Sequence, residues 1–435
     1  MWTSVRPLRS RNFALVWSSA MVSNVGSWIQ TVALGIVVTS RSHNPLWTGA
    51  VAAAAFIPIG VLAPVGGALA DRLDRRRWLI VTTLGEAAFA TVMAVLAATG
   101  HDPSWSLVVL AFLGGAAAAV GFPTYQAMVP DLVPPADLVG AVSLSSAQFN
   151  LGRVIGPALA GVLLWAGSPA LAFTVNAVSF GAVVLALTFV RLPARAPGRA
   201  DGGIVARIAE GARTAAAEPG CRSAIVLIGI VALIGSPFIA LVPAVAIDGL
   251  KRGIPGTSVL VTAQGVGAVL GALALAPLAQ RLGRRLQVGA LFAFPAAVVL
   301  YGLAPSLWSA APAIVVVGGC YIGVLTGLNT VVQRRAPAHA RGRVLGLYMM
   351  TLGIFYAIGA VAEGAIAHAV GIEKVTVGSG VLLLAVMASI AVLRRRLFTS
   401  LDGVVAVSGA TADGQALSTA VADEVLAPTE TGVTR

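Results

Sequence analysis

The sequence contains twelve runs of mostly apolar residues, and each run is long enough to cross a lipid bilayer as a helix. A spanning helix needs about 20 such residues. Only 11% of the 435 residues are charged, whereas soluble domains carry about 25%. One aqueous core cannot bury this much apolar surface, so we exclude a soluble enzyme and expect an all-α integral membrane protein. The runs are 12–40, 46–70, 78–99, 105–128, 138–166, 169–190, 222–247, 257–280, 286–304, 307–332, 343–369 and 372–393.

The placement of arginine predicts the orientation of these runs. With the N-terminus inside, 24 of the 29 basic residues fall in inner segments and only four fall in outer loops. Basic residues favour the cytoplasmic side of a membrane protein. We therefore expect both termini in the cytoplasm. The first run is predicted to remain as the first helix, because no small-residue cleavage site of a signal peptide follows it.

Two stretches are not expected to enter the bilayer. Residues 192–221 form a central inner loop, and four of its apolar residues share one helical face, which is typical of a short amphipathic helix at a membrane surface: Ile204, Val205, Ile208 and Ala212. Residues 398–435 show no periodicity and predict a disordered tail. The expected organisation is an N-terminal six-helix bundle (1–191), a linker (192–221), a C-terminal six-helix bundle (222–397) and a cytoplasmic tail (398–435).

An internal repeat divides the chain into two halves. LADRLDRRR (69–77) follows the second run, and LAQRLGRRL (278–286) follows the eighth, at a separation of 209 residues. A second correspondence, at a separation of 203, aligns Pro134, Gly156 and Gly161 with Pro337, Gly359 and Gly364. Two tandem six-helix halves are an architecture of transporters, in which the substrate site lies near the bilayer midplane between the halves.

The connection between the second and third runs reads GALADRLDRRRWL (67–79). It resembles the corresponding signature of the major facilitator superfamily. The resemblance implies a conformational latch: Gly67 permits close helix packing, and Asp71 accepts bonds from a helix N-terminus and pairs with an arginine such as Arg72, Arg75 or Arg76. In the family, this aspartate holds the inner ends of the two halves together in one conformation. The alternative is that the arginines only enforce topology.

The fifth run contains SAQFNLGRVIGPALAG (146–161). Small residues at this spacing allow helices to approach closely, and Pro157 removes a backbone donor and bends the helix. The segment resembles the exporter signature of the same superfamily, which is used in proton-coupled drug antiporters. The matching residues are Gly152, Gly156, Pro157 and Gly161. The alternative is ordinary packing of small residues in a membrane helix.

Across residues 8–395, the chain resembles the branch of the superfamily that contains enterobactin-exporter-like and multidrug permeases. The resemblance rests on FALVWSSAMVSNVGSWIQTVAL (13–34), MVPDLVPPADL (128–138) and RVIGPALAG (153–161). It implies the major facilitator fold, with twelve transmembrane helices in two six-helix halves. It also implies a bacterial inner membrane as the location.

Three ionisable residues lie clearly inside the runs. A charge in hydrocarbon costs about 2.5–3.5 kcal/mol or more, so each should face the bundle interior or water. Arg153 is a candidate for contacting substrate or an ion partner, or alternatively a structural arginine bonded to carbonyl groups. Glu363 lies in the repeat partner of that helix and is a candidate proton carrier. Its alternatives are a structural hydrogen bond or a place in an outer vestibule. Glu86 is interpreted mainly as support for the cavity wall.

Polar and aromatic residues on four of the predicted helices are candidates for lining a binding chamber. An aromatic residue within a span is more often a packing residue than a ligand contact, so we expect only some of them to touch substrate. A chamber with aromatic rings and few fixed charges suits a bulky amphipathic compound. The candidates are Asn24, Trp28, Gln30, Gln148, Asn150, Tyr321, Asn329, Tyr348 and Tyr356.

Several classes of function are excluded by what the sequence lacks. The arginines form short clusters between apolar runs and no single basic face, so we expect no nucleic-acid binding. Neither lysine lies in a phosphate-binding loop, and the histidines and the two cysteines show no metal-ligand spacing. We therefore expect no catalytic reaction, no cofactor and no metal.

The predicted function is a secondary active transporter that exports drugs, siderophores or other amphipathic small molecules in exchange for protons. The two halves would rock about the central site. One chain contains both halves, so a monomer is expected. Two alternatives stay open at this point. The first is an importer or facilitator of a small nutrient, and the second is a transport-inactive membrane sensor, for which the long tail is the only supporting feature.

Overall fold

The computed structural model describes residues 3–166, 168–190, 204–337 and 340–401, and every element in these ranges is helical. Eleven helical segments among the described residues are long and apolar enough to cross a bilayer, and α5 adds a helix of 29 residues. The predicted twelve-helix architecture is confirmed. The N-terminal half contains α1 (Arg11–Ser42), α2 (Pro45–Arg72), α3 (Arg75–Thr99), α4 (Ser104–Met128), α5 (Leu138–Ala166) and α6 (Pro169–Phe189).

The C-terminal half follows a 14-residue helix, α7 (Ile204–Ala217). It contains α8 (Pro219–Ile230), η4 (Val231–Gly235), α9 (Phe238–Ala244), η5 (Val245–Gly249), α10 (Gly253–Leu282), α11 (Arg284–Gly302), α12 (Leu307–Arg335), α13 (Arg341–Val370) and α14 (Ile372–Leu393). Short helical turns complete the fold: η1 (Thr3–Arg9), η2 (Val129–Leu132), η3 (Pro135–Asp137) and α15 (Arg396–Thr399).

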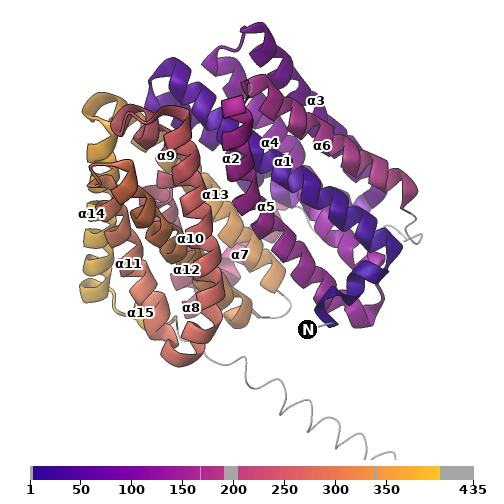
Figure 1. Ribbon diagram of the computed structural model, residues 1–435. Helices are drawn as coiled ribbons and strands as arrows, with labels where there is room; N and C mark the ends of the chain where they lie inside the picture. The colour runs from indigo at the N-terminus through magenta and orange to yellow at the C-terminus, as the bar shows by residue number, and fades with distance from the viewer. Residues whose placement is uncertain (1–2, 167, 191–203, 338–339, 402–435) are drawn as a thin grey trace, which may run out of the picture.

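The two halves lie side by side, and the described helices of each half pack mainly on one another (Figure 1). In the first half, α2 packs on α4, α3 on α4 and α6, and α1 on α5 and α6. In the second half, α10 and α11 pack on α12, and α11 packs on α14. We call the side where α1 and α8 begin and α14 ends the terminal face, and the opposite side the distal face.

The first span of the C-terminal half differs from the single continuous helix predicted over 222–247. It consists of two α-helical pieces, α8 and α9, each followed by a π-helical turn, η4 and η5. Pro237 has no N–H to donate to the carbonyl of Leu233, and Pro243 interrupts α9 in the same way. The Ser236 N–H instead reaches back five residues to the Val231 carbonyl, at 2.8 Å. The wider turn accommodates a proline that an α-helix would not.

Both halves use glycine to bring their first and fifth spans together. A methyl group added at Gly156 of α5 would overlap Trp28 of α1, and one added at Gly359 of α13 would overlap the Leu233 carbonyl of η4. Gly156 and Gly359 are the pair that the internal repeat predicts. Close backbone approach at small residues is the main source of packing energy between membrane helices, so the repeat in the sequence is also a repeat in the contacts.

The segment after α14 packs against the C-terminal half. Phe398 and Leu401 are buried, and the Phe398 ring lies 6.1 Å from that of Phe292 in α11. The Ser400 hydroxyl donates to the Ser223 hydroxyl of α8 at 2.8 Å. The tail expected from 398 therefore begins with four residues that belong to the packed fold. The rest of that expected tail, 402–435, lies outside the described residues, as does the linker stretch 191–203.

Candidate functional site

The two halves meet along a surface that we call the central seam, where α2 packs along α13 and α5 packs against α10. Glycines make the closest approaches. A methyl group at Gly49 of α2 would overlap the Ala360 carbonyl of α13, and one at Gly364 would lie 2.6 Å from the Pro45 carbonyl. Small residues at these positions let the backbones of the two helices approach closely.

Tyr356 of α13 lies in this seam. It is 6% exposed, and its ring meets that of Phe56 in α2 edge to face, with centroids 5.0 Å apart. Aromatic pairs of this geometry are favourable beyond the area that they bury. Of the residues predicted to line the chamber, Tyr356 has a ring contact from one half to the other.

Glu363 lies two helical turns from Tyr356 on the same face of α13, because residues seven apart align on a helix. It is 8% exposed. No hydrogen bond or ion pair of its carboxylate is found among the described residues. Gly359 on one side of this face contacts η4, and Gly364 on the other contacts α2. Glu363 therefore points toward the junction of α13, α2 and the first span of the C-terminal half.

The halves also touch at their distal ends. His43, which follows α1, and Asp248 of η5 form a polar contact between the halves, with His43 Nδ1 and Asp248 Oδ1 3.0 Å apart. A methyl group at Gly35 of α1 would lie 3.3 Å from Pro243 of α9. The contacts at Pro45 and Gly364 lie at the same end of the molecule. In this conformation the distal face is the closed side of the seam.

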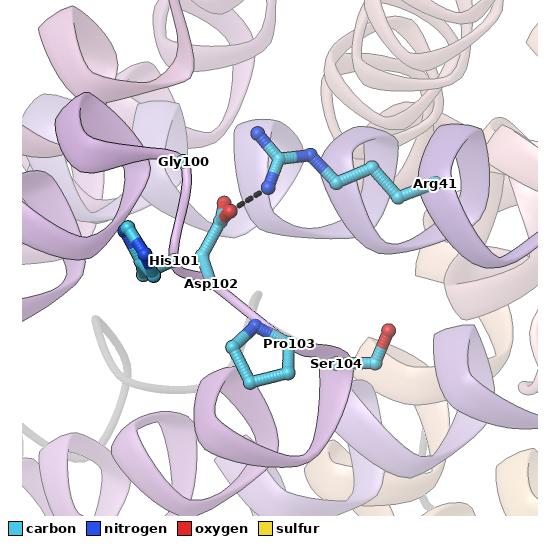
Figure 2. A pocket seen from close by; sticks show the side chains of 6 residues that line it. All are labelled: Arg41, Gly100, His101, Asp102, Pro103 and Ser104. Atoms are coloured by element: carbon cyan, nitrogen blue, oxygen red, sulfur yellow. Dashed lines mark ion pairs between the residues drawn. The ribbon is translucent and has the colours of Figure 1, made fainter.

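A second ion pair at the distal face stays within the first half. Figure 2 shows Arg41, in the last turn of α1, pointing at Asp102 in the loop between α3 and α4. The Asp102 side chain is fully buried, whereas that of Arg41 is 42% exposed. This pair ties α1 to the α3–α4 loop. Arg41 is one of the four basic residues that the sequence assigns to outer loops, and no sequence pattern predicts its partner.

The predicted chamber residues of the first half bond to neighbouring helices of that half. Asn24 Nδ2 donates to the carbonyls of Gln148 and Phe149, each at 3.1 Å. Trp28 packs edge to face on Phe149 at 6.3 Å. Gln30 Oε1 accepts from Asn176 at 2.9 Å, and Gln148 Oε1 accepts from Tyr125 at 3.1 Å. These polar groups hold α1, α4, α5 and α6 together.

The predicted chamber residues Tyr321, Tyr348 and Asn329 also make their contacts within their own half, the second. Tyr321 is 4% exposed and packs with Phe238 and Phe294 in the core of that half. The Tyr348 hydroxyl donates to the Leu325 carbonyl at 2.9 Å. Asn329, on the terminal half of α12, is half-buried and accepts from Gln333 at 2.5 Å. Tyr321 and Tyr348 therefore pack α12 against its neighbours.

The predicted latch segment joins α2 and α3 at the terminal face. Arg75 Nη1 donates to Asp131 at 2.7 Å and to the Ala127 carbonyl, and Arg76 donates to the carbonyls of Leu187 and Thr188. Both arginines thus bond within the first half, whereas Arg72 is exposed. The close packing expected at Gly67 is not made in this conformation, because an added methyl group there would meet nothing within 4 Å.

Its neighbour Gly66 makes the close approach instead, since an added methyl group would lie 2.6 Å from Val120 Cα of α4. Successive residues of a helix point about 100° apart, so only one of the two glycines can face α4.

In the fifth span, Gly152 of α5 packs directly on Asn24, and Pro157 is buried. Asp71 lies in α2, and Asn150, Arg153 and Gly161 lie in α5, but their side-chain surroundings are outside the described part of the structure.

Glu86 is half-buried in α3, which packs on α4 and α6 of its own half and takes no part in the seam. The structure thus places Glu363 at the junction of the halves and Glu86 away from it. Within the described ranges, no group of three or more His, Cys, Asp or Glu side chains lies together as a metal site would require.

Twelve spans in two repeated halves, which meet at a seam of glycines beside the buried Glu363, are the architecture of a membrane transporter. The chain belongs to the transmembrane secretion effector family of the major facilitator superfamily, whose family model matches residues 2–424. This assignment confirms the resemblance found in the sequence. The chain is a multi-pass membrane protein of a transporter family, and its substrate is a small molecule.

Named relatives include efflux and siderophore transport proteins. The chain is 28% identical over 369 residues to a multidrug efflux pump, Tap, of Mycolicibacterium fortuitum. The alignment covers 82% of this chain and 90% of the pump. It is 32% identical over 170 residues to the staphyloferrin A transporter of Staphylococcus aureus, covering 39% of this chain and 43% of that protein.

A solved structure shows the same fold. A bacterial homologue of the human lysosomal transporter Spinster, in an inward-facing and unoccupied conformation, superposes with a TM-score of 0.73. The comparison covers 91% of this chain and 99% of that one, at 16% sequence identity. The two halves of this chain are therefore arranged as in that structure.

Proposed function

We propose that this protein exports amphipathic small molecules from the cytoplasm in exchange for protons, and that Glu363 carries the proton. The observation that carries the proposal is a carboxyl group, 8% exposed and without a described partner, at the point where the halves meet. We assign the terminal face to the cytoplasm because the arginines gather there. The membrane is then the bacterial inner membrane, with both termini inside.

The position of Glu363 connects protonation to movement of the halves. A charged carboxylate enclosed between packed helices costs several kcal/mol, whereas its neutral form costs much less. The seam therefore closes at the distal face more readily over a protonated Glu363. Opening of that face exposes the side chain to water and lets it exchange a proton with the outside. Proton uptake from outside then favours the conformation described here, in which the distal side is closed.

In that conformation the substrate would enter from the cytoplasmic side. The aromatic pair of the seam, Phe56 and Tyr356, and the pair Trp28 and Phe149 in the first half offer flat apolar surface and few fixed charges. Such surroundings suit drugs, siderophores and other molecules with both apolar and polar parts. This substrate class agrees with the names of the relatives, a multidrug efflux pump and a siderophore transporter. Arg153, which follows Gly152 in α5, is proposed to contact substrate or pair with an ion.

The cycle needs no chemical reaction and no cofactor, because proton binding and substrate binding are enough to shift the balance between two conformations. Each chain contains both halves and the seam between them, so a monomer is proposed as the working unit. The latch at Asp71 and its neighbouring arginines is proposed to stabilise the opposite conformation, in which the terminal ends of the halves come together.

The proposal is tested by proton movement in inside-out vesicles that contain the protein. An acid-inside gradient is imposed, and lipophilic cations, antibiotics and catecholate siderophores are added one at a time. We expect some of these compounds to release protons from the vesicles, and we expect Glu363→Gln to abolish the release. Glu373→Gln, which changes an exposed glutamate at the distal end of α14, serves as the matched control.

Substrate-dependent proton release that persists in Glu363→Gln would show that another group carries the proton. Accumulation of a compound in right-side-out vesicles, driven by its own gradient and independent of protons, would favour a facilitator or importer instead.

A further inference from the structure

The helix α7 stands between the two halves in the chain, and it contacts helices of both. It packs on α13 and α8 of the C-terminal half and reaches α2 of the first half (Figure 1). We propose that α7 is a strap: docked on α13, it stabilises the conformation described here, and it leaves this position before the terminal ends of α2 and α13 come together. The inference rests on the movement of the halves in the proposed function and depends on neither the substrate nor the proton.

One face of α7 is docked on the C-terminal half. Gly211 and Ala215 are buried, and Ile208, one turn earlier on the same face, is half-buried. A methyl group added at Gly211 would lie 3.0 Å from the Arg343 carbonyl and 3.2 Å from Arg343 Cβ. Glycine therefore lets the backbone of α7 lie directly on the first turn of α13.

An ion pair joins α7 to the same turn of α13. Arg343 Nη2 donates to Glu210 Oε1 at 2.7 Å. The Glu210 side chain is 49% exposed and that of Arg343 is 30% exposed, so water can replace the partner of each when the pair opens. Exposed ion pairs contribute modestly to stability, which suits a contact that is made in one conformation and broken in the other.

The strap lies where the halves approach each other at the terminal face. The helices α2 and α13 pack along the central seam. At the terminal face, α2 ends at Arg72 and α13 begins at Arg341. Because α7 touches that first turn of α13 and leads directly into the start of α8, its contact with α2 is also made at this face. Closing the terminal face would bring the ends of α2 and α13 together where α7 contacts both.

The C-terminal end of α7 is fixed to the C-terminal half by a separate contact. A single residue, Glu218, separates α7 from α8, and its carboxylate accepts from the Cys221 N–H at 2.6 Å. This bond caps α8 and involves neither Glu210 nor Arg343. Release of Arg343 would therefore let α7 swing about Glu218 while α8 keeps its place.

The test measures the two conformations by distances between spin labels on the full chain, in lipid nanodiscs without substrate. One label pair spans the terminal ends of the halves (R77C/R394C) and another spans the distal ends (H101C/K374C), with both native cysteines replaced by alanine. The conformation described here has the longer terminal distance and the shorter distal distance. E210Q should lower the ratio of this conformation to the opposite one about twofold to fivefold, the usual contribution of an exposed ion pair.

Gly211→Leu should lower the same ratio about fivefold or more, because a side chain forced against the Arg343 backbone penalises only the docked position of α7. Gly342→Leu is the matched control. Gly342 is the exposed neighbour of Arg343, and an added methyl group there would meet nothing within 4 Å. If the wild type shows only the described conformation, the absence of a second one in Gly211→Leu overturns the proposal.

Arg213→Gln, which changes an exposed residue of α7, is the matched control for E210Q and should leave the ratio unchanged. The double variant E210Q/R343Q should lower the ratio no further than R343Q alone, because the two side chains act as one unit. A ratio for E210Q equal to that of Arg213→Gln would overturn the proposal, and so would a shift toward the described conformation. Since no substrate is present and the pH is constant, failure of the proton-exchange test at Glu363 would leave these distances unaffected.

Discussion

The two halves of this transporter repeat their packing but not their charges. Gly156 in the first half and Gly359 in the second each press a helix backbone against the first span of their own half. At the same separation of 203 residues, Glu363 corresponds to Ala160, and Arg153 corresponds to Tyr356. Ala160 is fully buried and Glu363 is 8% exposed. The contacts between helices were kept in both copies, whereas ionisable groups stand in different places.

The difference follows from what each feature requires. Close packing of two membrane helices needs small residues at the contact and is spoiled by any larger side chain, so both halves need the same glycines. A buried charge is costly and is kept where it serves a purpose. The two halves therefore share a scaffold, and the second half contributes the buried carboxylate of Glu363 at the seam.

The shared packing can be broken by Gly156→Val and Gly359→Val. Each added side chain would collide with backbone or with Trp28 Cβ, which cannot move aside as a flexible chain end can. Overpacking costs about 1–3 kcal/mol and occasionally more, and we expect values at or above the upper end in both variants. The measurement is thermal unfolding of each variant, monitored by size-exclusion chromatography. Gly181→Ala is the control, because nothing lies within 4 Å of its added methyl group. Tolerance of one valine and not the other would show that the packing is not equivalent.

The difference between the halves in their buried carboxylates can be tested by comparing Glu363→Gln with Glu86→Gln. Of these two residues, only Glu363 lies where the halves meet, so its substitution should abolish the stimulation of transport by a proton gradient, which is about 5-fold to 150-fold for the usual coupling between two bound species. Glu86→Gln should change the rate much less. The measurement is the transport rate of each variant in vesicles with and without a proton gradient. A larger loss for Glu86→Gln would move the proton site into the first half.

The terminal faces can be compared through Arg76 and its repeat partner Arg285. Arg76 donates to the Leu187 and Thr188 carbonyls at 2.7 and 2.9 Å, whereas Arg285 is exposed. Hydrogen bonds of charged groups contribute about 1.5–3 kcal/mol, so Arg76→Gln should lower the free energy of unfolding by about that amount. Arg285→Gln should change it by no more than about 0.5 kcal/mol. Denaturation in the same detergent checks both, and equal losses would contradict the comparison.

The smallest effect is expected at the distal contact between the halves. His43 is 67% exposed in its pair with Asp248, and exposed pairs contribute about 0–1 kcal/mol. A double-mutant cycle of His43→Gln and Asp248→Asn should give a coupling energy in that range. His101→Gln, an exposed histidine on the same face, should show no coupling to Asp248. A coupling well above this range would make the pair a principal support of the closed distal side.

Helix positions were predictable to within a few residues because each span must satisfy its own backbone hydrogen bonds in lipid. The range predicted for the fifth span, 138–166, is the range of α5. The division of the seventh span was missed, although Pro237 and Pro243 were its signal. In this conformation Gly66, and not Gly67, faces α4, and the sequence does not show which of two adjacent glycines faces the neighbouring helix.

Most of the site was not predictable in detail. Asn24, Gln30 and Gln148 were expected to line the chamber, and each bonds to a helix of its own half. Polar residues in a membrane helix face the interior for either purpose, so composition cannot separate packing from binding. The contact between His43 and Asp248 joins residues 205 positions apart, and no local pattern marks such a pair.

The sequence by itself determined the membrane class, the number of spans and the two repeated halves, because these depend on hydropathy and spacing along the chain. The tertiary structure decided which carboxylate lies at the seam, which arginines are neutralised and which side of the seam is closed. These depend on how helices rotate and approach one another. The rotation of each helix is set by close contacts, such as those at glycines, between residues far apart in the chain. The sequence pattern does not show which residues make these contacts.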